Sequence, residues 1–443
     1  MSLNCYFASL GCDKNLVDTE KMMALLRDDG VIFTDDPAEA EVIIVNTCAF
    51  VLDAKEESIE TIIELAEYKK TGKCKALIAA GCLAQRYSEE IRTEIPEIDA
   101  VIGTSGYDDI SKAVAQVIKG ERVELLKDTA YLPKHLTKRV VTGSGAVNYL
   151  KIAEGCDKHC TYCIIPKLRG SYRSVPMDEL VEEATLLAEK GTKELILVAQ
   201  ETTVYGVDIY GKKSLPELLE KLNAIDGIEW IRIMYCYPEE ITEELLLTMK
   251  SLPKVCHYLD LPIQHCDDDI LRRMGRRTDE KDIRNKIELI RKILPDATLR
   301  TTIISGFPGE SEAAHNKLLD FVKDIKFDRL GVFAYSIEEG TPAADFDDQI
   351  DEQLKIDRAD EIMLAQKEII SAENKSFVGK TMSVFTEGFL PEDNCYIGRT
   401  YRDAPDIDGY VFFESDSNLM SGDIVKVYIE NANDYDLKGR ETS

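Results

Sequence analysis

The chain has 443 residues, of which 44% are hydrophobic, and it carries 54 Lys and Arg against 82 Asp and Glu, a net charge of −28. This length predicts two to four domains, and no run of about 18 apolar residues is present, which excludes a membrane span. The first 14 residues lack the basic and apolar regions of a signal peptide, so we expect a cytoplasmic protein. The acidic surface repels nucleic-acid phosphates and favours basic partners, although solubility alone explains it equally well.

Residues 1–138 alternate short apolar strands with helical segments. Strands are expected at 5–9, 42–45, 76–80 and 100–102, and helices at 16–27 and 54–68. This α/β alternation predicts a doubly wound parallel sheet with helices on both faces. The segment 131–145 contains Pro133, Gly143 and Gly145, has no regular period, and is expected to be a linker.

Residues 139–372 repeat the β/α pattern six times and end in a long helix at 351–377. The expected strands are 150–153, 194–198, 230–234, 257–261, 300–304 and 330–334. Six consecutive units predict a partial (βα)6 barrel of the TIM type.

Residues 375–443 lose the helical period. Short strands separated by turn residues are expected at 382–385, 395–399, 409–413 and 424–429. This pattern predicts a small antiparallel β-barrel, similar to an OB fold.

Twelve cysteines are present, and disulfides are rare in the cytosol, so metal or redox chemistry is the better explanation for several of them. Six fall into two groups that are described below. The other six are expected to be small buried apolar residues: Cys5, Cys74, Cys236, Cys256, Cys266 and Cys395.

The first group, the barrel cysteines, consists of Cys156, Cys160 and Cys163, with three and two residues between them. Three thiolates on a four-iron cluster leave one iron open for another ligand. The group follows the first barrel strand, and barrel active sites are built at the carboxyl ends of strands. The alternatives are a ferredoxin-type cluster and a zinc site with His159 as fourth ligand, but zinc sites usually contain a second cysteine pair.

The second group, the N-terminal cysteines, consists of Cys12, Cys48 and Cys82. Each begins a loop after a predicted parallel strand, where open α/β sheets bind ligands. Neighbouring strands would bring the three sulfurs together around a second cluster that also has an open iron. The alternative is three unrelated loop cysteines.

The spacing of the barrel cysteines, with the aromatic Tyr162 before the last one, resembles the radical S-adenosylmethionine superfamily. The resemblance implies that the open iron binds the amino and carboxylate groups of S-adenosylmethionine, which is cleaved to a radical. Tyr162, Gln200 and Gly306 are expected to contact this cofactor. The alternative for Tyr162 is ordinary loop packing. For Gln200 it is a polar side chain whose hydrogen bonds are satisfied at the barrel rim, and for Gly306 it is a simple turn.

Both cysteine groups together, with the segments 199–201 (Ala-Gln-Glu), 261–265 (Leu-Pro-Ile-Gln-His) and 306–310 (Gly-Phe-Pro-Gly-Glu), are similar to the methylthiotransferases of that superfamily. The similarity covers essentially the whole chain. It implies an N-terminal cluster domain (1–138), a radical barrel (139–372) and a C-terminal TRAM domain (375–443). It also implies two 4Fe-4S clusters together with S-adenosylmethionine.

Within this family the segments 9–15 and 398–409 resemble the branch that modifies an aspartate of small-subunit ribosomal protein S-twelve. The sister branch, MiaB, modifies a tRNA adenosine and is the alternative. Residues 371–443 contain 7 Lys and Arg against 14 Asp and Glu, a net charge of −7. A domain that grips tRNA should be basic, so we expect a basic protein substrate and no direct nucleic-acid binding.

The target carbon of the aspartate is an unactivated sp³ centre that no side-chain base deprotonates at neutral pH. A cofactor must therefore carry out the removal of its hydrogen. The resemblance implies that a radical removes the hydrogen, that the second cluster supplies the sulfur, and that a second S-adenosylmethionine supplies the methyl group. No catalytic side chain beyond the cluster ligands is expected. An electron donor such as flavodoxin or ferredoxin and an unidentified sulfur donor complete the expected partners.

Overall fold

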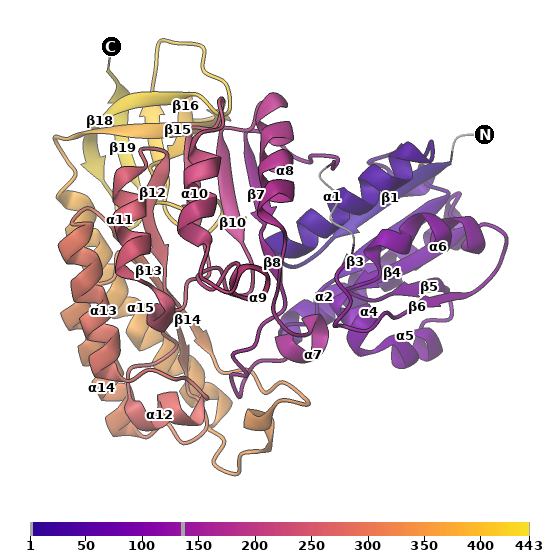
Figure 1. Cartoon of the computed structure of the whole chain (residues 1–443), viewed down its shortest axis with the longest axis horizontal. Helices are drawn as coiled ribbons and strands as arrows, with labels where there is room; N and C mark the ends of the chain where they lie inside the picture. Colours follow the sequence, from indigo (N-terminus) through magenta and orange to yellow (C-terminus); the bar gives the residue numbers. More distant parts are fainter. Residues whose placement is uncertain (1–2, 134–137, 443) are drawn as a thin grey trace.

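The computed structural model describes residues 3–133 and 138–442, so part of the predicted linker, residues 134–137, lies outside the described residues. Figure 1 shows three units, with an N-terminal sheet and a C-terminal barrel lying on different sides of a central β/α unit. None of the helices in the described ranges has the length and apolar content needed to cross a bilayer.

The N-terminal unit is a parallel sheet of six strands in the order β2-β1-β3-β4-β5-β6, which confirms the doubly wound fold. Its strands are β1 (Asn4–Ser9), β2 (Ile32–Phe33), β3 (Val42–Thr47), β4 (Ala76–Gly81), β5 (Ile98–Ile102) and β6 (Val123–Leu125). Its α-helices are α1 (Asp13–Asp28), α2 (Leu52–Ala66), α3 (Tyr68–Thr71), α4 (Cys82–Arg86), α5 (Ser88–Glu94) and α6 (Ile110–Val117). The edge strands β2 and β6 were not predicted, because two or three residues carry no readable period.

Helices cover both faces of this sheet. Ile43 and Val45 pack into one apolar core, and Val42 and Ile44 pack into another on the opposite face. A continuous apolar run is therefore buried on both sides, as a parallel sheet requires.

The central unit is an open parallel sheet of six strands in the order β14-β13-β12-β11-β10-β7, which confirms the partial (βα)6 barrel. Its strands are β7 (Val147–Lys151), β10 (Glu194–Val198), β11 (Trp230–Ile233), β12 (Val255–Asp260), β13 (Thr298–Ser305) and β14 (Arg329–Ala334). Its main helices are α8 (Met177–Glu189), α10 (Leu215–Asn223), α11 (Glu243–Ser251), α13 (Glu280–Ile293), α14 (Glu312–Ile325) and the closing helix α15 (Glu352–Lys375). Short helices are α7 (Ile165–Arg169), α9 (Val207–Tyr210) and α12 (Asp268–Arg273).

The first barrel strand differs from the prediction. It leaves the sheet after Lys151, and the next two residues form β8 (Ala153–Glu154), which pairs with β9 (Arg173–Ser174). These two short strands flank the segment that carries the barrel cysteines.

The C-terminal unit is a closed five-stranded barrel in the order β15-β16-β17-β19-β18. Its strands are β15 (Thr381–Leu390), β16 (Cys395–Arg399), β17 (Val411–Glu414), β18 (Ile424–Ala432) and β19 (Leu437–Glu441). The expectation of an entirely antiparallel barrel is wrong in one pairing, because β17 and β19 run parallel. Strand β19 was missed because it contains a single apolar residue, Leu437.

Buried charges fix this small barrel to the central unit. Arg399 forms an ion pair with Glu194, which also accepts from Arg232 Nε at 2.9 Å. Arg329 pairs with Asp403 across the same boundary. These groups are almost inaccessible to solvent, and removing one partner of a buried pair is strongly destabilising, so these pairs hold the small barrel against the central unit.

Five of the six cysteines outside the two groups are buried, as predicted; Cys395 on β16 is only half-buried.

Candidate active site

The barrel cysteines lie in the loop between β8 and α7. Gly155 has a left-handed backbone conformation, with φ +81°. A Cβ there would lie 2.1 Å from the Ser171 carbonyl oxygen, so only glycine fits. Cys156 N donates to the Gly170 carbonyl at 3.1 Å, and Cys163 N donates to the Cys160 carbonyl at 3.0 Å. Backbone hydrogen bonds therefore hold the conformation of this loop.

Burial raises the pKa of the Cys156 thiol to about 11 and that of Cys163 to about 12, with further contributions from the neighbouring thiols. Such thiols are protonated at neutral pH until a cation displaces the protons.

The N-terminal cysteines meet at the carboxyl edge of the first sheet. Cys12 directly precedes α1, Cys48 follows β3, and Cys82 is the first residue of α4. A Cβ on Gly11 would lie 2.9 Å from Cys48 Sγ, so only glycine fits beside that sulfur. Burial raises the pKa of Cys82 to about 11, Arg169 lowers it, and the thiols of Cys12 and Cys48 raise it further.

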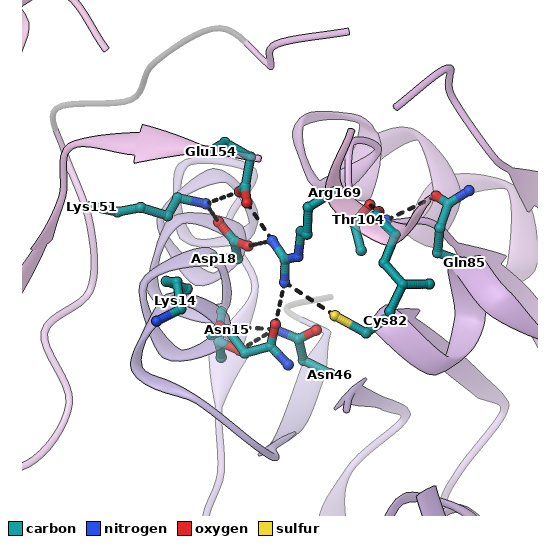
Figure 2. Close-up of polar contacts among 12 residues, drawn as sticks. Lys14, Asn15, Asp18, Asn46, Cys82, Gln85, Thr104, Lys151, Glu154 and Arg169 are labelled. Carbon is teal, nitrogen blue, oxygen red and sulfur yellow. Dashed lines mark hydrogen bonds and ion pairs between the residues drawn. The ribbon is translucent and has the colours of Figure 1, made fainter. Parts of the chain in front are cut away.

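Arg169, at the end of α7, connects the segment that follows the barrel cysteines to Cys82 of the N-terminal group (Figure 2). Its guanidinium donates to Cys82 Sγ at 3.5 Å and to Asn15 Oδ1. It also pairs with Asp18 at 2.9 Å and with Glu154 at 3.0 Å. The arginine thus joins the barrel loop to α1 and α4 of the first domain.

Further contacts extend this connection. Lys151 at the end of β7 pairs with Glu154 at 2.8 Å and with Asp18. Thr104 Oγ1 of the first domain donates to the Leu168 carbonyl on α7 at 2.7 Å. On the other side, Arg86 of α4 pairs with Glu338 in the loop after β14 at 3.1 Å. The edge that carries the N-terminal cysteines is therefore held against the carboxyl end of the central barrel.

Gln200, Glu201 and Gln264 supply buried acceptors at the carboxyl ends of β10 and β12. Among the described residues, Gln200 Oε1 and Gln264 Oε1 find no hydrogen-bond partner, and Glu201 Oε2 has no hydrogen bond but forms an ion pair with Lys158 at 3.6 Å. Gln200 Nε2 donates to Glu154 Oε1 at 2.8 Å, so this side chain also touches the Arg169 network. Buried acceptors without donors are costly, and an ammonium and ribose hydroxyls are the donors that would satisfy them.

Burial raises the pKa of Glu201 to about 7, against the lowering effects of Thr203 and of Lys158, which is 3.6 Å away. Gln264 adopts a left-handed backbone with φ +69°. Backbone strain at a non-glycine residue is typical of functional sites.

The other two predicted cofactor contacts have protein partners. The Tyr162 ring packs edge-to-face against Phe307, with centroids 6.4 Å apart. A Cβ on Gly306 would lie 2.4 Å from Lys355 Cγ of the closing helix, and its N–H donates to Glu310 at 2.8 Å. The close approach at Gly306 is therefore to α15, and contact of Tyr162 or Gly306 with a cofactor stays a prediction.

Thiolates around one zinc ion lie about 3.8 Å apart, given a Zn–S distance of about 2.3 Å. Within the described ranges, no three His, Cys, Asp or Glu side chains are close enough to hold a single metal ion. His159, the suggested fourth zinc ligand, is exposed. The assignment of iron–sulfur clusters to the two cysteine groups therefore stays a prediction.

Sequence reasoning missed Arg169, Glu201 and Gln264 as site residues. Glu201 and Gln264 lie in segments already compared with the family, and each follows a strand end. The bridging role of Arg169 could not be predicted from the sequence, because its partners Asn15, Asp18 and Cys82 are about 90 to 150 residues away in sequence.

Three family models match the chain: the uncharacterized protein family UPF0004 over residues 4–103, the radical SAM superfamily over 150–322, and the TRAM domain over 378–441. A ribosomal protein uS12 methylthiotransferase RimO from Lachnoclostridium phytofermentans is 59% identical, with 99% of each chain covered. The protein of that name from Clostridioides difficile is 52% identical, with 97% of each covered.

Among solved structures, the radical S-adenosylmethionine methyltransferase TsrM from Kitasatospora setae superposes with a TM-score of 0.58 at 12% identity, covering 77% of each chain. The radical enzyme OxsB gives a TM-score of 0.52 at 13% identity, covering 81% of this chain and 56% of that one. At these identities the likeness concerns the fold alone.

Proposed function

Because the chain belongs to the ribosomal protein uS12 methylthiotransferases, which are radical S-adenosylmethionine enzymes, we propose that it adds a methylthio group to the β-carbon of an aspartate in uS12, the S-twelve of the sequence analysis. The structural observation that carries the proposal is the Arg169 bridge. It joins a second set of three convergent thiols to the loop of the radical cysteines, and sulfur insertion needs both sets at one substrate atom.

The proposed domains are residues 1–138, 139–372 and 375–443, which the three family matches support. We assign one 4Fe-4S cluster to the barrel cysteines and a second to the N-terminal cysteines. When bound, the clusters and S-adenosylmethionine supply the electron, the radical, the sulfur and the methyl group.

The protein groups have separate roles in this proposal. Gln200, Glu201 and Gln264 accept hydrogen bonds from the ammonium and hydroxyl groups of S-adenosylmethionine. Cys12 is exposed, whereas Cys48 and Cys82 are buried, so the second set opens to its substrate on the Cys12 side. Arg169 places a fixed positive charge beside the Cys82 sulfur.

The acidic charge supports a basic protein substrate rather than tRNA. The whole chain carries −28, and binding to phosphates requires the opposite sign. We therefore propose no direct nucleic-acid contact, action in the cytoplasm on uS12, and reduction by a donor such as flavodoxin or ferredoxin.

Mass analysis of uS12 and of tRNA from a strain that lacks the gene tests this assignment. The proposal predicts that uS12 loses its methylthio group and that the tRNA adenosine modification persists. Loss of the tRNA modification with intact uS12 would overturn it.

A further inference from the structure

Helix α2 presents an apolar stripe to solvent directly beside the N-terminal cysteines. The helix begins at Leu52, four residues after Cys48, and its inner face is buried. Its outer face exposes Leu52 by 51%, Ile59 by 37% and Ile63 by 52%. These residues are spaced by seven and four positions, so they lie on one side of the helix. Outer faces of surface helices are normally polar, so a stripe about 16 Å long at 1.5 Å per residue suggests a partner.

The same face is strongly acidic. Five carboxylates of α2 are exposed: Asp53, Glu56, Glu57, Glu60 and Glu64. The one basic residue of the helix, Lys55, pairs with Glu338 of the central unit at 2.9 Å. The outer face therefore combines apolar side chains with uncompensated negative charge.

An ion pair joins α2 to the rim of the barrel. Glu338, which binds Lys55 and also Arg86, follows Ile337, which is 47% exposed. An exposed apolar residue of the barrel rim is therefore the sequence neighbour of the residue that pairs with α2.

We propose that the outer face of α2, together with Ile337, is the docking surface for a basic segment of the protein substrate. This rests on the proposed function. A ribosomal protein binds RNA phosphates and therefore carries an excess of Lys and Arg, which complements the five carboxylates. Apolar anchors surrounded by charged residues have the composition of a protein interface, with Leu52, Ile59 and Ile63 as its core. Docking there delivers the substrate next to Cys48.

Two double variants of the full chain, reconstituted with iron and sulfide, separate the contribution of charge from that of the apolar side chains. Glu56→Lys with Glu60→Lys reverses charge, and Leu52→Ser with Ile63→Ser removes apolar anchors. The matched control, Leu364→Ser with Glu368→Lys, makes both kinds of change on the exposed face of α15. The readouts are KM and kcat for uS12 and the cleavage of S-adenosylmethionine without uS12.

The proposal predicts that each α2 variant raises KM for uS12 about tenfold, while the control changes it less than about twofold. Cleavage without uS12 stays at the wild-type rate. Salt at about 0.5 M reduces the effect of the charge variant and leaves that of the apolar variant.

An unchanged KM in both α2 variants overturns the docking surface while leaving the proposed function intact. Failure of the wild-type chain to modify uS12 overturns the proposed function itself. A wild-type dimer that the apolar variant dissociates would show that the stripe binds a second copy of the chain, which also overturns the proposal.

Discussion

The guanidinium of Arg169 lies 3.5 Å from the sulfur of Cys82, although the two residues belong to different domains. Arg169 follows Cys163 by six residues in the same loop and short helix. One buried cation therefore sets the position of the barrel loop relative to the second group of thiols. It also offsets negative charge on any thiolate that Cys82 contributes.

Replacing Arg169 with Gln leaves Asp18 and Glu154 buried with Lys151 as the remaining cation of the network. We expect the cluster-free protein to lose about 3 kcal/mol of unfolding free energy, as when one member of a buried charge network is removed. Denaturant unfolding measures this. The control Arg92→Gln removes a half-exposed ion pair with Glu124 and should cost less than about 1 kcal/mol. Equal losses in the two variants would contradict the bridging role.

Gly11→Ala should remove the second cluster selectively. The new Cβ would lie 2.6 Å from Cys48 Cβ and 2.9 Å from its sulfur. We expect reconstituted protein to hold about four irons instead of about eight.

Gly30→Ala is the matched control for Gly11, because its φ of +84° is nearly the same as +82° at Gly11 and no atom lies within 4 Å of the added Cβ. It imposes backbone strain without crowding a cysteine and should retain about eight irons. Iron loss in the control as well would attribute the effect to strain alone.

Glu201→Gln should weaken binding of S-adenosylmethionine. The variant keeps the shape of a buried side chain but removes the carboxylate that we propose accepts from the ammonium of S-adenosylmethionine, so we expect a Kd about tenfold higher. Calorimetry on reconstituted protein measures this. Glu243→Gln, an exposed change on α11, should leave the Kd unchanged. An unchanged Kd in Glu201→Gln would place the ammonium elsewhere.

Glu373 at the boundary with the C-terminal barrel should make stability depend on pH. Burial, followed by its hydrogen bond and charge interaction with Asp328, raises its pKa to about 7, and Arg402 and Arg329 oppose the shift. A folded-state pKa above the ordinary value of 4.5 means that the contribution of Glu373 to stability is complete below about pH 4.5 and is lost as pH rises through 7.

We therefore expect the unfolding free energy to fall between pH 5 and 8 by at most about 1 kcal/mol per pH unit. Glu373→Gln should flatten this slope, whereas Glu368→Gln on the exposed side of α15 should preserve it. Thermal unfolding at a series of pH values checks this, and an unchanged slope in Glu373→Gln would assign the pH dependence to other groups.

The sequence predicted the elements that bury long apolar runs. Strand β10 was predicted at its observed bounds, Glu194–Val198, because all five of its residues are buried and the run has clear ends. Short edge strands such as β2 carry too few residues for a period. The parallel pairing of β19 in the last barrel depends on closure of the barrel, which local sequence does not encode.

The sequence likewise predicted some features of the site and missed those that depend on distant contacts. Strand ends indicated where Cys12, Cys48 and Cys82 would meet, because parallel strands share one carboxyl edge. The packing of Gly306 against Lys355 and the reach of Arg169 to Cys82 are contacts between distant segments. Such contacts emerge only when the domains are assembled.

The central claim is that each cysteine group holds its own cluster and that the second is needed only for sulfur insertion. The most direct measurement is the iron content and product pattern of the variant in which Cys12, Cys48 and Cys82 are all replaced by Ala. The account predicts about four irons instead of about eight, continued cleavage of S-adenosylmethionine, and no methylthio group on uS12. A variant that still methylthiolates uS12, or that loses all of its iron together with cleavage, would contradict it.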